Sequence, residues 1–477
     1  MLFSELGLPM EILKAAKKLG YEEATEIQAK TIPLLLEGRD VTGRSRTGTG
    51  KTAAFGIPAV MSVKRPDADA VRVLALCPTR ELAVQVCGEL EKFAEFMPWV
   101  RTCAVYGGAD MDRQISCLKR GVNIVVGTPG RVLDHMRRRT LRLDGIRMVI
   151  LDEADEMLDM GFREDIETIL NAVPTERQTA LFSATMPEPI SAIAEKYQRD
   201  PITVGAEQAS RTVESVKQFY FCVPMGRKTD ALRMLLLAYE PKLSIVFCNT
   251  KKMVDELSER LTANGFRAAG LHGDMNQQSR TRTLNAFKNG GLNILIATDV
   301  AARGIDVEGV DAVFNYDIPQ NREYYIHRVG RTGRAGKSGT AYTIVCGGRQ
   351  ESELMDIARS TKARIERREL PARDEVLAAK AKAASASVME AAASGRYKSF
   401  EKQIEHLERD GFSAKQIAAA LLGMKVSAET AAVPEFIKPV PAKERDGGRR
   451  RDFGRGKSFK RPYHGSTAGR RNSKRYQ

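Results

Sequence analysis

Short runs rich in β-branched residues alternate with helix-like segments over the first 370 residues, and this alternation limits the possible folds more than any other feature. Strands separated by helices predict a parallel sheet covered by helices. Because the runs fall into two series, we predict two α/β domains in tandem. The first series is Val71–Cys77, Asn123–Val126, Met148–Leu151 and Thr179–Phe182, and the second is Ser244–Cys248, Asn293–Ala297, Ala312–Asn315 and Thr340–Val345.

Changes in composition divide the chain into five parts. The stretch 206–215 has weak structural signals and is predicted to link a domain at 1–205 to a second domain at 216–370. Residues 371–437 are rich in alanine and have apolar positions at helical spacing, with Ser413 and Gln416 as a predicted capping box. Residues 438–477 contain few aliphatic side chains, so we predict a disordered tail.

Positive charge is concentrated in this tail, which holds 14 Lys and Arg against three acidic residues, a net charge of +11. The rest of the chain supplies only +4 of the total of +15. Clustered cations release counterions from phosphate backbones, so the tail predicts a nucleic-acid partner, and its aromatic residues suit loose contact with single strands. The alternative is a solvated tail that only aids solubility. A membrane surface is disfavoured because the tail lacks an amphipathic helix period.

The composition excludes several classes of protein. Hydrophobic residues make up 43% of the chain and charged residues 28%, and no apolar stretch approaches the roughly 18 residues of a spanning helix. Collagen-like, wholly disordered and membrane-spanning chains are therefore excluded. The first residues lack the layout of a secretory signal, and the seven cysteines include no CxxC pair. We therefore expect a cytoplasmic protein with neither a disulfide framework nor a zinc site.

The segment from Ser45 to Thr52 has the features of a phosphate-binding loop, although Ser45 replaces the first glycine of the general pattern. Its glycines let backbone N–H groups approach phosphates, Lys51 can neutralise the β- and γ-phosphates, and the Thr52 hydroxyl can hold Mg²⁺. The alternative is a chance glycine-rich turn. The candidate nucleotide-binding residues are Ser45, Arg46, Thr47, Gly48, Thr49, Gly50, Lys51 and Thr52.

The tetrapeptide Asp152–Asp155 directly follows a predicted buried strand. Asp152 at the end of that strand can hold Mg²⁺ and its waters, and Glu153 can orient or deprotonate an attacking water. The alternative is a solvated acidic turn, or Asp155 acting only as a helix cap. The presence of a phosphate loop about 100 residues earlier favours the catalytic interpretation.

A third motif, His327–Arg334, lies in the second predicted domain. Its arginines recur every three residues, and Arg331 and Arg334 can reach a transferring phosphoryl group. A basic surface turn is the alternative. If these arginines complete the site of the first domain, the two domains must close before hydrolysis.

Together, and in this order, the three motifs resemble those of the DEAD-box ATP-dependent RNA helicases. The resemblance covers Phe3 to about residue 370. It implies two tandem RecA-like parallel-sheet domains, the cofactors ATP and Mg²⁺, and RNA as the partner. The implied activity is RNA-stimulated ATP hydrolysis, coupled to local unwinding of short RNA duplexes without sequence preference.

The resemblance also assigns residues around the nucleotide. It implies that Gln28 reads the adenine edge, that Tyr21 stacks on the base with Phe3 upstream, and that Gly304 and Asp306 touch the ribose. Ala24 and Glu26 depart from the family pattern, which often has proline at both positions. The residues implied to couple hydrolysis to unwinding are Asp155, Ser183, Thr185 and His327.

The RNA-contacting residues implied by the resemblance come from both domains. In the first domain they are Pro78, Thr79, Arg80, Gly107, Gly108, Thr128, Pro129 and Arg131. In the second domain they are Thr250, Gln277, Arg280, Thr298 and Arg303. Threonine hydroxyls, arginines and backbone amides grip phosphates and 2′-hydroxyls without reading bases.

The region after residue 368 resembles the bacterial cold-shock (DeaD/CshA-like) subgroup, in Glu369–Pro371, Arg373–Val376 and Ile417–Leu422. This implies that 371–437 can form a homodimer, that the basic tail adds RNA affinity, and that the protein works in ribosome biogenesis, RNA decay or cold adaptation. Ribosomal particles and RNA-decay enzymes are the implied partners. The alternative for 371–437 is a set of helices packed on their own core.

Two other functions remain open from the sequence. One is an ATP-gated RNA clamp or chaperone scaffold that binds RNA with little unwinding. The other is a DNA translocase, which the DEAD tetrapeptide and the glutamine segment disfavour.

Overall fold

The computed structural model describes residues 1–45, 49–65, 70–205, 216–302, 309–333, 339–430 and 434. The chain divides into two compact units, Met1–Pro439 and Val440–Gln477, and the described residues all belong to the first unit. The predicted linker at 206–215 and the predicted tail at 438–477 lie outside the described residues.

Seven parallel strands form the first sheet, in the order β3-β4-β2-β5-β6-β1-β7. Strands buried on both faces are apolar throughout, and β5 shows why. Met148 and Ile150 pack into one core, whereas Val149 and Leu151 pack into the core on the other face. The strands are β1 (Val41–Arg44), β2 (Val73–Leu76), β3 (Thr102–Val105), β4 (Ile124–Gly127), β5 (Met148–Leu151), β6 (Gln178–Ser183) and β7 (Ile202–Val204).

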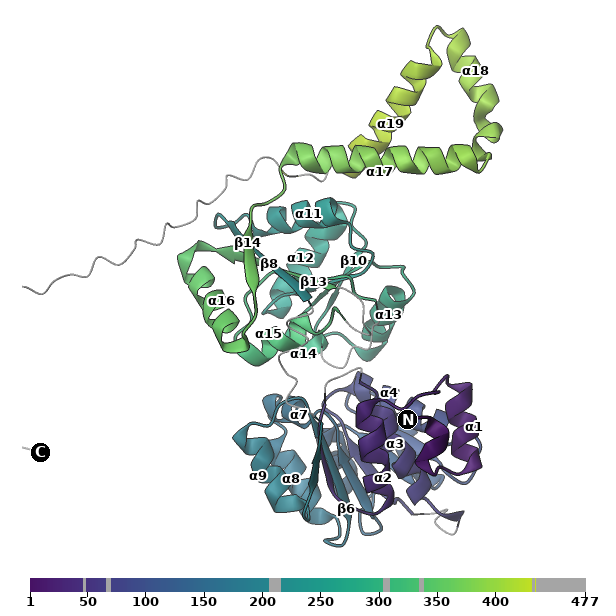
Figure 1. Ribbon diagram of the computed structural model, residues 1–477, viewed down its shortest axis with the longest axis vertical. Helices are drawn as coiled ribbons and strands as arrows, with labels where there is room; N and C mark the ends of the chain where they lie inside the picture. Colours follow the sequence, from purple (N-terminus) through teal and green to yellow (C-terminus); the bar gives the residue numbers. More distant parts are fainter. Residues whose placement is uncertain are drawn as a thin grey trace, which may run out of the picture. The chain divides into compact units, whose positions relative to one another are not determined.

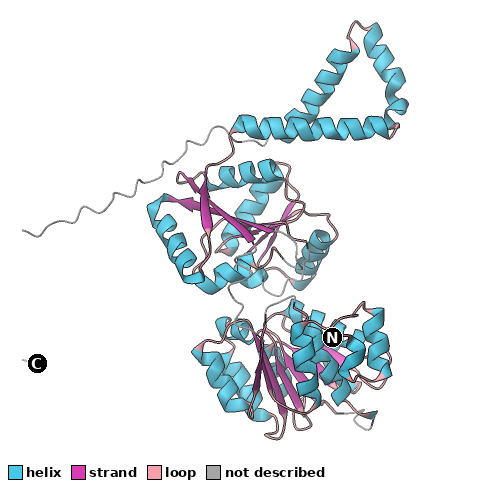
Figure 2. Cartoon of the chain, viewed as in Figure 1, coloured by secondary structure: helices cyan, strands magenta, loops and turns pink. Residues whose placement is uncertain are grey.

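Helices cover this sheet on both sides (Figures 1 and 2). Residues of α1 to α4 contribute to the first core, and residues of α6 to α9 contribute to the second. The helices are η1 (Phe3–Leu6), α1 (Met10–Lys18), α2 (Glu26–Leu36), α3 (Lys51–Ser62), α4 (Arg80–Phe93), α5 (Met111–Lys119), α6 (Pro129–Arg137), α7 (Ala154–Asp159), α8 (Arg163–Ala172) and α9 (Glu188–Tyr197).

The second sheet repeats the first. Its order is β10-β11-β9-β12-β13-β8-β14, again all parallel. Its strands are β8 (Val216–Val223), β9 (Ser244–Phe247), β10 (Ala268–Leu271), β11 (Ile294–Ala297), β12 (Ala312–Asn315), β13 (Gly339–Cys346) and β14 (Ile365–Arg368). Its helices are α11 (Lys228–Tyr239), α12 (Lys251–Ala263), α13 (Gln277–Lys288), α14 (Asp299–Ala302), α15 (Arg322–Val329) and α16 (Gly347–Thr361).

Because the two orders match strand for strand, each loop of the first sheet has a counterpart in the second. The loop after β2 corresponds to the loop after β9, and the loop after β4 corresponds to the loop after β11. All eight runs that the sequence predicted as strands are strands, and no end differs from the prediction by more than two residues. The predicted pair of parallel-sheet domains is confirmed.

The helical segment after the second sheet consists of α17 (Arg373–Ala393), η3 (Arg396–Phe400), α18 (Glu401–Arg409) and α19 (Ala414–Thr430). Val376 of α17 packs with Met234 and Leu237 of α11, which attaches the segment to the second domain. Helix α19 returns to contact α17 (Figure 1). The predicted capping box is confirmed, because Ser413 and Gln416 bond each other's backbone N–H groups at 2.9 and 3.3 Å.

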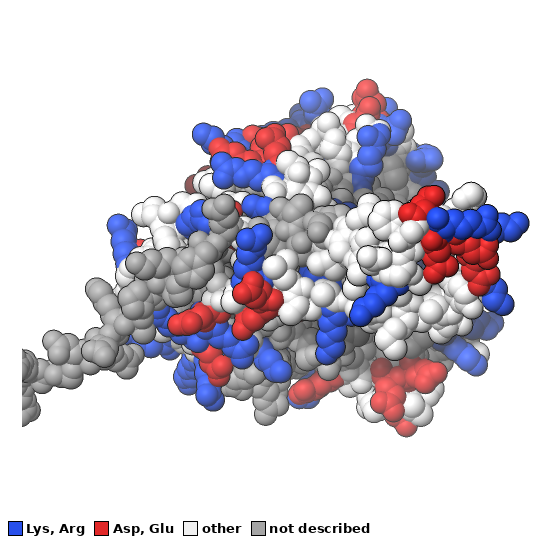
Figure 3. Space-filling view, turned by 90° about the horizontal axis from the view of Figure 1, so that it is seen from above, with Lys and Arg blue, Asp and Glu red and all other residues white. Residues whose placement is uncertain are grey.

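Charge on the described part of the molecule is mixed. The face in Figure 3 carries interspersed basic and acidic side chains, which agrees with the small net charge of the chain outside the tail. Within the described ranges, every helix is too short or too polar to cross a lipid bilayer.

Candidate functional site

The phosphate loop is fixed by the N-terminus of α2. The Gln28 side chain donates a hydrogen bond to the Gly50 carbonyl at 3.1 Å, and the Thr25 hydroxyl donates to the Thr49 carbonyl at 3.0 Å. Gly50 has φ +87°, and a Cβ there would lie 2.3 Å from the Gln28 amide nitrogen. Only glycine fits this close approach in a left-handed conformation. Arg46, Thr47 and Gly48 lie outside the described residues.

Lys51 and Asp152 form the charged floor of this site. The Lys51 Nζ lies 3.6 Å from the Asp152 Oδ1, and both side chains are almost fully buried. The loop after β1 places Lys51 at the start of α3, and β5 ends directly before Asp152, so two strands of one sheet that are separated only by β6 bring the pair together. Burial raises the pKa of Asp152, and the positive charge of Lys51 opposes that rise.

Glu153 combines backbone strain with a shifted pKa. It has φ +51°, a left-handed conformation rare for a residue with a side chain and frequent at functional sites. Burial raises the pKa of its carboxyl to about 7. The like charges of Asp152 and Glu156 add to this rise in pKa. Lys51 and Arg331 oppose it, so an arginine of the second domain acts on the same carboxyl as the loop lysine.

The predicted coupling residues of the first domain are in direct contact. The Asp155 carboxylate accepts hydrogen bonds from the backbone N–H and the hydroxyl of Thr185, both at 2.8 Å. The Asp155 N–H donates to the Ser183 hydroxyl at 3.3 Å. The start of α7 is thereby tied to the end of β6, so a shift of one is transmitted to the other.

The second domain reaches this network through His327 and Arg331. The His327 Nδ1 lies 2.8 Å from the Glu156 Oε1. The Arg331 Nε donates to the His327 carbonyl at 3.3 Å, and Arg331 is buried. Arg334 lies outside the described residues. The structure thus brings Arg331 into the neighbourhood of Glu153.

Arg328 belongs to the same segment but points into its own domain. It is 1% exposed and binds both carboxylate oxygens of Asp299, at 2.5 and 2.7 Å. It also donates to the Asn249 side chain at 2.8 Å. Arg328 therefore holds together the loops after β9 and β11, a role that the sequence did not reveal.

The residues implied to bind adenine gather beside α2. The rings of Phe3 and Tyr21 are 5.3 Å apart, and Gln28 is buried. Both ends of the Gln28 amide have partners, because its oxygen also accepts from the Thr25 N–H at 2.9 Å. Gln28 thus links the predicted adenine segment to the phosphate loop. Gly304 and Asp306 lie outside the described residues.

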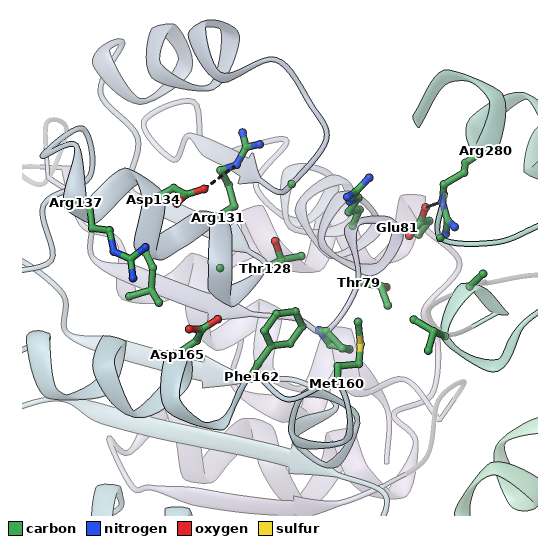
Figure 4. A pocket seen from close by; sticks show the side chains of 18 residues that line it. Thr79, Glu81, Thr128, Arg131, Asp134, Arg137, Met160, Phe162, Asp165 and Arg280 are labelled. Atoms are coloured by element: carbon green, nitrogen blue, oxygen red, sulfur yellow. Dashed lines mark hydrogen bonds and ion pairs between the residues drawn. The ribbon is translucent and has the colours of Figure 1, made fainter. Parts of the chain in front are cut away.

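Most predicted RNA-contacting residues of the first domain line one cavity of about 530 Å³ (Figure 4). We call this cavity the groove. Predicted residues that line it are Pro78, Thr79, Arg80, Gly107, Thr128, Arg131 and, from the second domain, Arg280. Lining residues that the sequence analysis did not single out include Glu81, Asp134, Arg137, Met160, Phe162 and Asp165. The groove therefore adds acidic and apolar surfaces to the predicted basic one.

Threonines occupy equivalent positions in the two sheets. Thr79 after β2 and Thr250 after β9 cap α4 and α12, accepting hydrogen bonds from backbone N–H groups at 3.3 and 3.2 Å. Thr128 precedes α6, with Pro129 in its first turn, and Thr298 accepts from the N–H of residue 301 at 3.4 Å. The repeated strand order thus places similar polar loops at the carboxyl ends of both sheets.

The two adjacent glycines make room for Arg80. Gly108 has φ +82°, and a Cβ there would lie 2.3 Å from the Arg80 Nη1. A Cβ on Gly107 would lie 3.7 Å from the same guanidinium group. The guanidinium therefore rests on bare backbone, which requires glycine at Gly108 for both its conformation and its space.

Contacts between the two domains cross the groove. The Arg280 Nε lies 2.9 Å from the Glu81 Oε1, and both side chains are largely buried. The Arg80 Nη1 donates to the Gln277 Oε1 at 3.3 Å. Three predicted RNA-contacting residues therefore also hold α4 against α13. Arg303 lies outside the described residues.

Comparisons with known protein families match three regions of the chain. Three family models match: DEAD/DEAH box helicase at 25–193, helicase conserved C-terminal domain at 227–336, and RNA helicase DeaD dimerization domain at 371–438. The first two lie within the two sheet domains that carry the site.

Two curated relatives are similar over most of their length. The DEAD-box ATP-dependent RNA helicase CshA of Geobacillus kaustophilus is 46% identical over 96% of this chain and 98% of its own. The ATP-dependent RNA helicase CshA of Listeria monocytogenes is 46% identical over 92% of this chain and 84% of its own.

A solved structure shares the architecture of both sheet domains. The structure of S. cerevisiae Dbp5 bound to RNA and ADP BeF3 is 33% identical, with a TM-score of 0.72 over 79% of this chain and 97% of that chain. The sequence and the fold of both sheet domains thus agree with those of known relatives. On these grounds the chain belongs to the DEAD-box ATP-dependent RNA helicases, which are ATPases that act on RNA.

Proposed function

We propose that the buried charges around Glu153 are the ATP-hydrolysing centre of this helicase, and that RNA held in the groove stimulates them. The observation that carries the proposal is the convergence of Lys51, Asp152 and Glu153 of one domain with Arg331 of the other. In this proposal 1–205 is the ATP-binding domain, and 216–370 is the domain that completes the ATP-hydrolysing centre.

Each charged residue has a defined task in this centre. Lys51 neutralises the β- and γ-phosphates, and Arg331, with Arg334, stabilises charge on the transferring phosphoryl group. Glu153 accepts the proton of the attacking water, because a carboxyl whose pKa is raised to about 7 is a stronger base than an ordinary one. The backbone amides of the phosphate loop hold the triphosphate in line with that water.

Mg²⁺ would be held by Thr52 and Asp152. The Asp152 Oδ1 is buried and lies 3.6 Å from the Lys51 Nζ, beyond hydrogen-bond distance, so this oxygen can also ligate a cation. The described residues contain no cluster of three or more candidate metal ligands. A Mg²⁺ site built from one carboxylate, one hydroxyl, phosphates and waters fits that donor set. When bound, the ion neutralises negative charge that develops on the phosphates.

The groove binds one RNA strand by its backbone. Hydroxyls of Thr79 and Thr128 and the guanidinium groups of Arg80 and Arg131 suit phosphates and 2′-hydroxyls, without contacts that distinguish bases. Binding across both domains bends the strand, so a short duplex loses stacking and its partner strand leaves. The likeness to a relative whose structure holds RNA and ADP BeF3 supports this arrangement.

The decisive experiment combines ATP hydrolysis with strand displacement. RNA-stimulated hydrolysis and repeated unwinding of a short RNA duplex should both be lost in Glu153→Gln, while ATP binding is retained and the closed complex with RNA is trapped. A matched DNA duplex should stay intact. Hydrolysis that ignores RNA would contradict the proposal. RNA-stimulated hydrolysis with no strand displacement would instead identify an ATP-gated clamp.

We also propose that 371–437 forms a homodimer, as the name of its matching family model suggests. Apolar side chains on this segment are exposed, among them Phe400, Leu421 and Met424. Leu421→Glu with Met424→Glu should shift the protein from dimer to monomer in light scattering, whereas Lys402→Glu on the exposed surface of α18 should not. A wild-type protein that is monomeric at micromolar concentration would contradict this proposal.

The cellular setting follows from the subgroup. We propose that the protein acts in the cytoplasm on ribosomal precursor or decaying RNA, with ribosomal particles or decay enzymes as partners, and that cold stress increases the need for it. The bacterial relatives, which are named as RNA helicases, support RNA as the target. Crosslinking of bound RNA in cells, followed by sequencing, identifies the targets; an absence of ribosomal and decaying RNA among them would contradict the proposal.

A further inference from the structure

The residue directly after the acidic tetrapeptide, Glu156, has no role in the function proposed above. It lies in the first turn of α7 and is 2% exposed. A carboxylate removed from water costs several kcal/mol unless a partner compensates its charge. The negative charge of Glu156 therefore needs a partner in the folded protein.

One compensating partner comes from the other domain. His327, in the last turn of α15, places its Nδ1 2.8 Å from the Glu156 Oε1. This contact joins residues 171 positions apart in the sequence, and it can exist only while the two sheet domains are together. If the domains separated, water would solvate both side chains, and neither would require the other to compensate its charge.

The contact also leads to the catalytic arginine. The His327 carbonyl accepts the hydrogen bond of the Arg331 Nε, at 3.3 Å. A histidine held by Glu156 therefore fixes the backbone from which Arg331 extends toward Glu153. On the other side, α7 also carries Asp155, which is bound to Thr185. Glu156 thus lies between the coupling residues and the arginine.

We propose that Glu156 is a positioning residue that docks His327 on domain closure and thereby places Arg331 at the ATP site. The inference rests on the role proposed for Arg331. It predicts that Glu156 contributes nothing to ATP binding by the open protein. Its contribution appears only when RNA and ATP together hold the domains closed.

A purely structural role for Glu156 makes different predictions. An acidic residue in the first turn of a helix stabilises that helix through the dipole, and its loss lowers thermal stability in every state. The matched control is Glu164→Gln, because Glu164 lies in the first turn of α8 and is exposed. If only the dipole matters, Glu156→Gln and Glu164→Gln should behave alike.

The test is a set of variants of the full chain. In Glu156→Gln, ATP affinity without RNA should stay within about twofold of wild type, while the KM for RNA in the ATPase reaction rises by roughly tenfold or more and kcat falls. Glu164→Gln should leave all three quantities unchanged. Glu156→Gln with an unchanged KM for RNA and an unchanged kcat would overturn the inference.

Two further measurements separate docking from folding. In a double-mutant cycle, His327→Gln should add little to the loss of RNA-stimulated ATPase activity in Glu156→Gln, because the contact between the two residues is already broken. Additive losses of this activity would overturn the inference. The exchanged pair Glu156→His with His327→Glu should recover most of the activity. If Glu153→Gln hydrolyses ATP normally, the proposed function fails; if only the Glu156 variants behave as wild type, the inference alone fails.

Discussion

Glu81 of α4 and Arg280 of α13 form an ion pair of 2.9 Å across the groove, although 199 positions separate them in the sequence. The resemblance to RNA helicases assigned Arg280 to RNA. In the structure its charge is already compensated by a carboxylate of the first domain. The pair therefore contributes to closure of the domains as well as to the electrostatics of the groove.

We expect the two partners of this pair to respond unequally to substitution. Arg280→Ala leaves Glu81 buried without its cation, so the KM for RNA should rise by roughly tenfold or more. Glu81→Ala frees Arg280 for phosphate contacts, so the KM for RNA should rise less in this variant. RNA-dependent ATPase titrations measure both values. Equal rises in the KM for RNA would mean that Glu81 and Arg280 contribute to RNA binding only through their attraction to each other.

Substitution of the phosphate-loop lysine should act on ATP alone. Lys51→Ala removes the cation beside Asp152 and the partner of the β- and γ-phosphates, so ATP affinity should fall by roughly a hundredfold. RNA affinity without nucleotide should not change. Lys30→Ala, an exposed lysine of α2, is the control. Binding of a fluorescent ATP analogue measures the effect, and normal affinity in Lys51→Ala would contradict the assignment.

Gly108→Ala should weaken RNA binding because its new methyl group occupies the place of the Arg80 guanidinium. Left-handed strain should also cost about 1–2 kcal/mol of stability. Gly265→Ala is a matched control, since Gly265 has the same φ of +82° but no atom within 4 Å of its Cβ position. Both variants should lose similar stability in denaturant unfolding. Only Gly108→Ala should lose RNA affinity.

Closure of the domains should weaken at alkaline pH. Burial alone would lower the pKa of His327, but its hydrogen bond to Glu156 and the charges of Glu156 and Asp155 raise it above 6.5, against the opposing charge of Arg331. The closed form therefore holds the proton of His327 more tightly than the open form. The protonated histidine contributes fully to domain closure below pH 6.5, and this contribution is lost as pH rises through the raised pKa.

Fluorescence transfer between labelled domains, with RNA and a non-hydrolysable ATP analogue, measures closure without the titration of Glu153 in catalysis. The control is Glu156→Gln, in which the pH dependence should flatten. A pH-independent wild type would exclude the protonated histidine from closure.

Removal of residues 438–477 should lower RNA affinity and its salt dependence, by up to about 0.7 log unit of slope for each lost phosphate contact. A variant with Phe453, Phe459, Tyr463 and Tyr476 changed to alanine keeps the charges and removes the rings. Its salt slope should equal that of wild type. An unchanged slope after removal of the tail would mean that the tail does not bind RNA.

Local pattern predicted eight of the strands, because most of their positions are apolar. The strands β1, β3, β7, β8, β10 and β14 were not predicted. In β14, exposed and half-buried residues alternate, and its sequence IERR contains three charged side chains. Nothing in so short and polar a run distinguishes a strand from a loop until β8 is beside it.

Motif spacing predicted Lys51, Asp152 and Glu153, because phosphate loops and acidic strand ends have fixed chemistry and a fixed order along the chain. It did not predict the buried network of Arg328 with Asp299. Spacing alone could not separate Arg328 from Arg331, since the two occupy similar positions in one segment. Their difference arises because Arg328 lies within α15 and binds Asp299 of its own domain, whereas Arg331 follows the end of α15 and its charge acts on Glu153 of the first domain.

The sequence by itself determined the two parallel-sheet domains, the phosphate loop and the acidic strand end, since each depends on residues that are close in the chain. Only the tertiary structure decided which charges meet between the domains, namely Glu81 with Arg280 and Glu156 with His327. Attraction between charges depends on their separation in space and on their removal from water, and neither quantity is set by position in the chain.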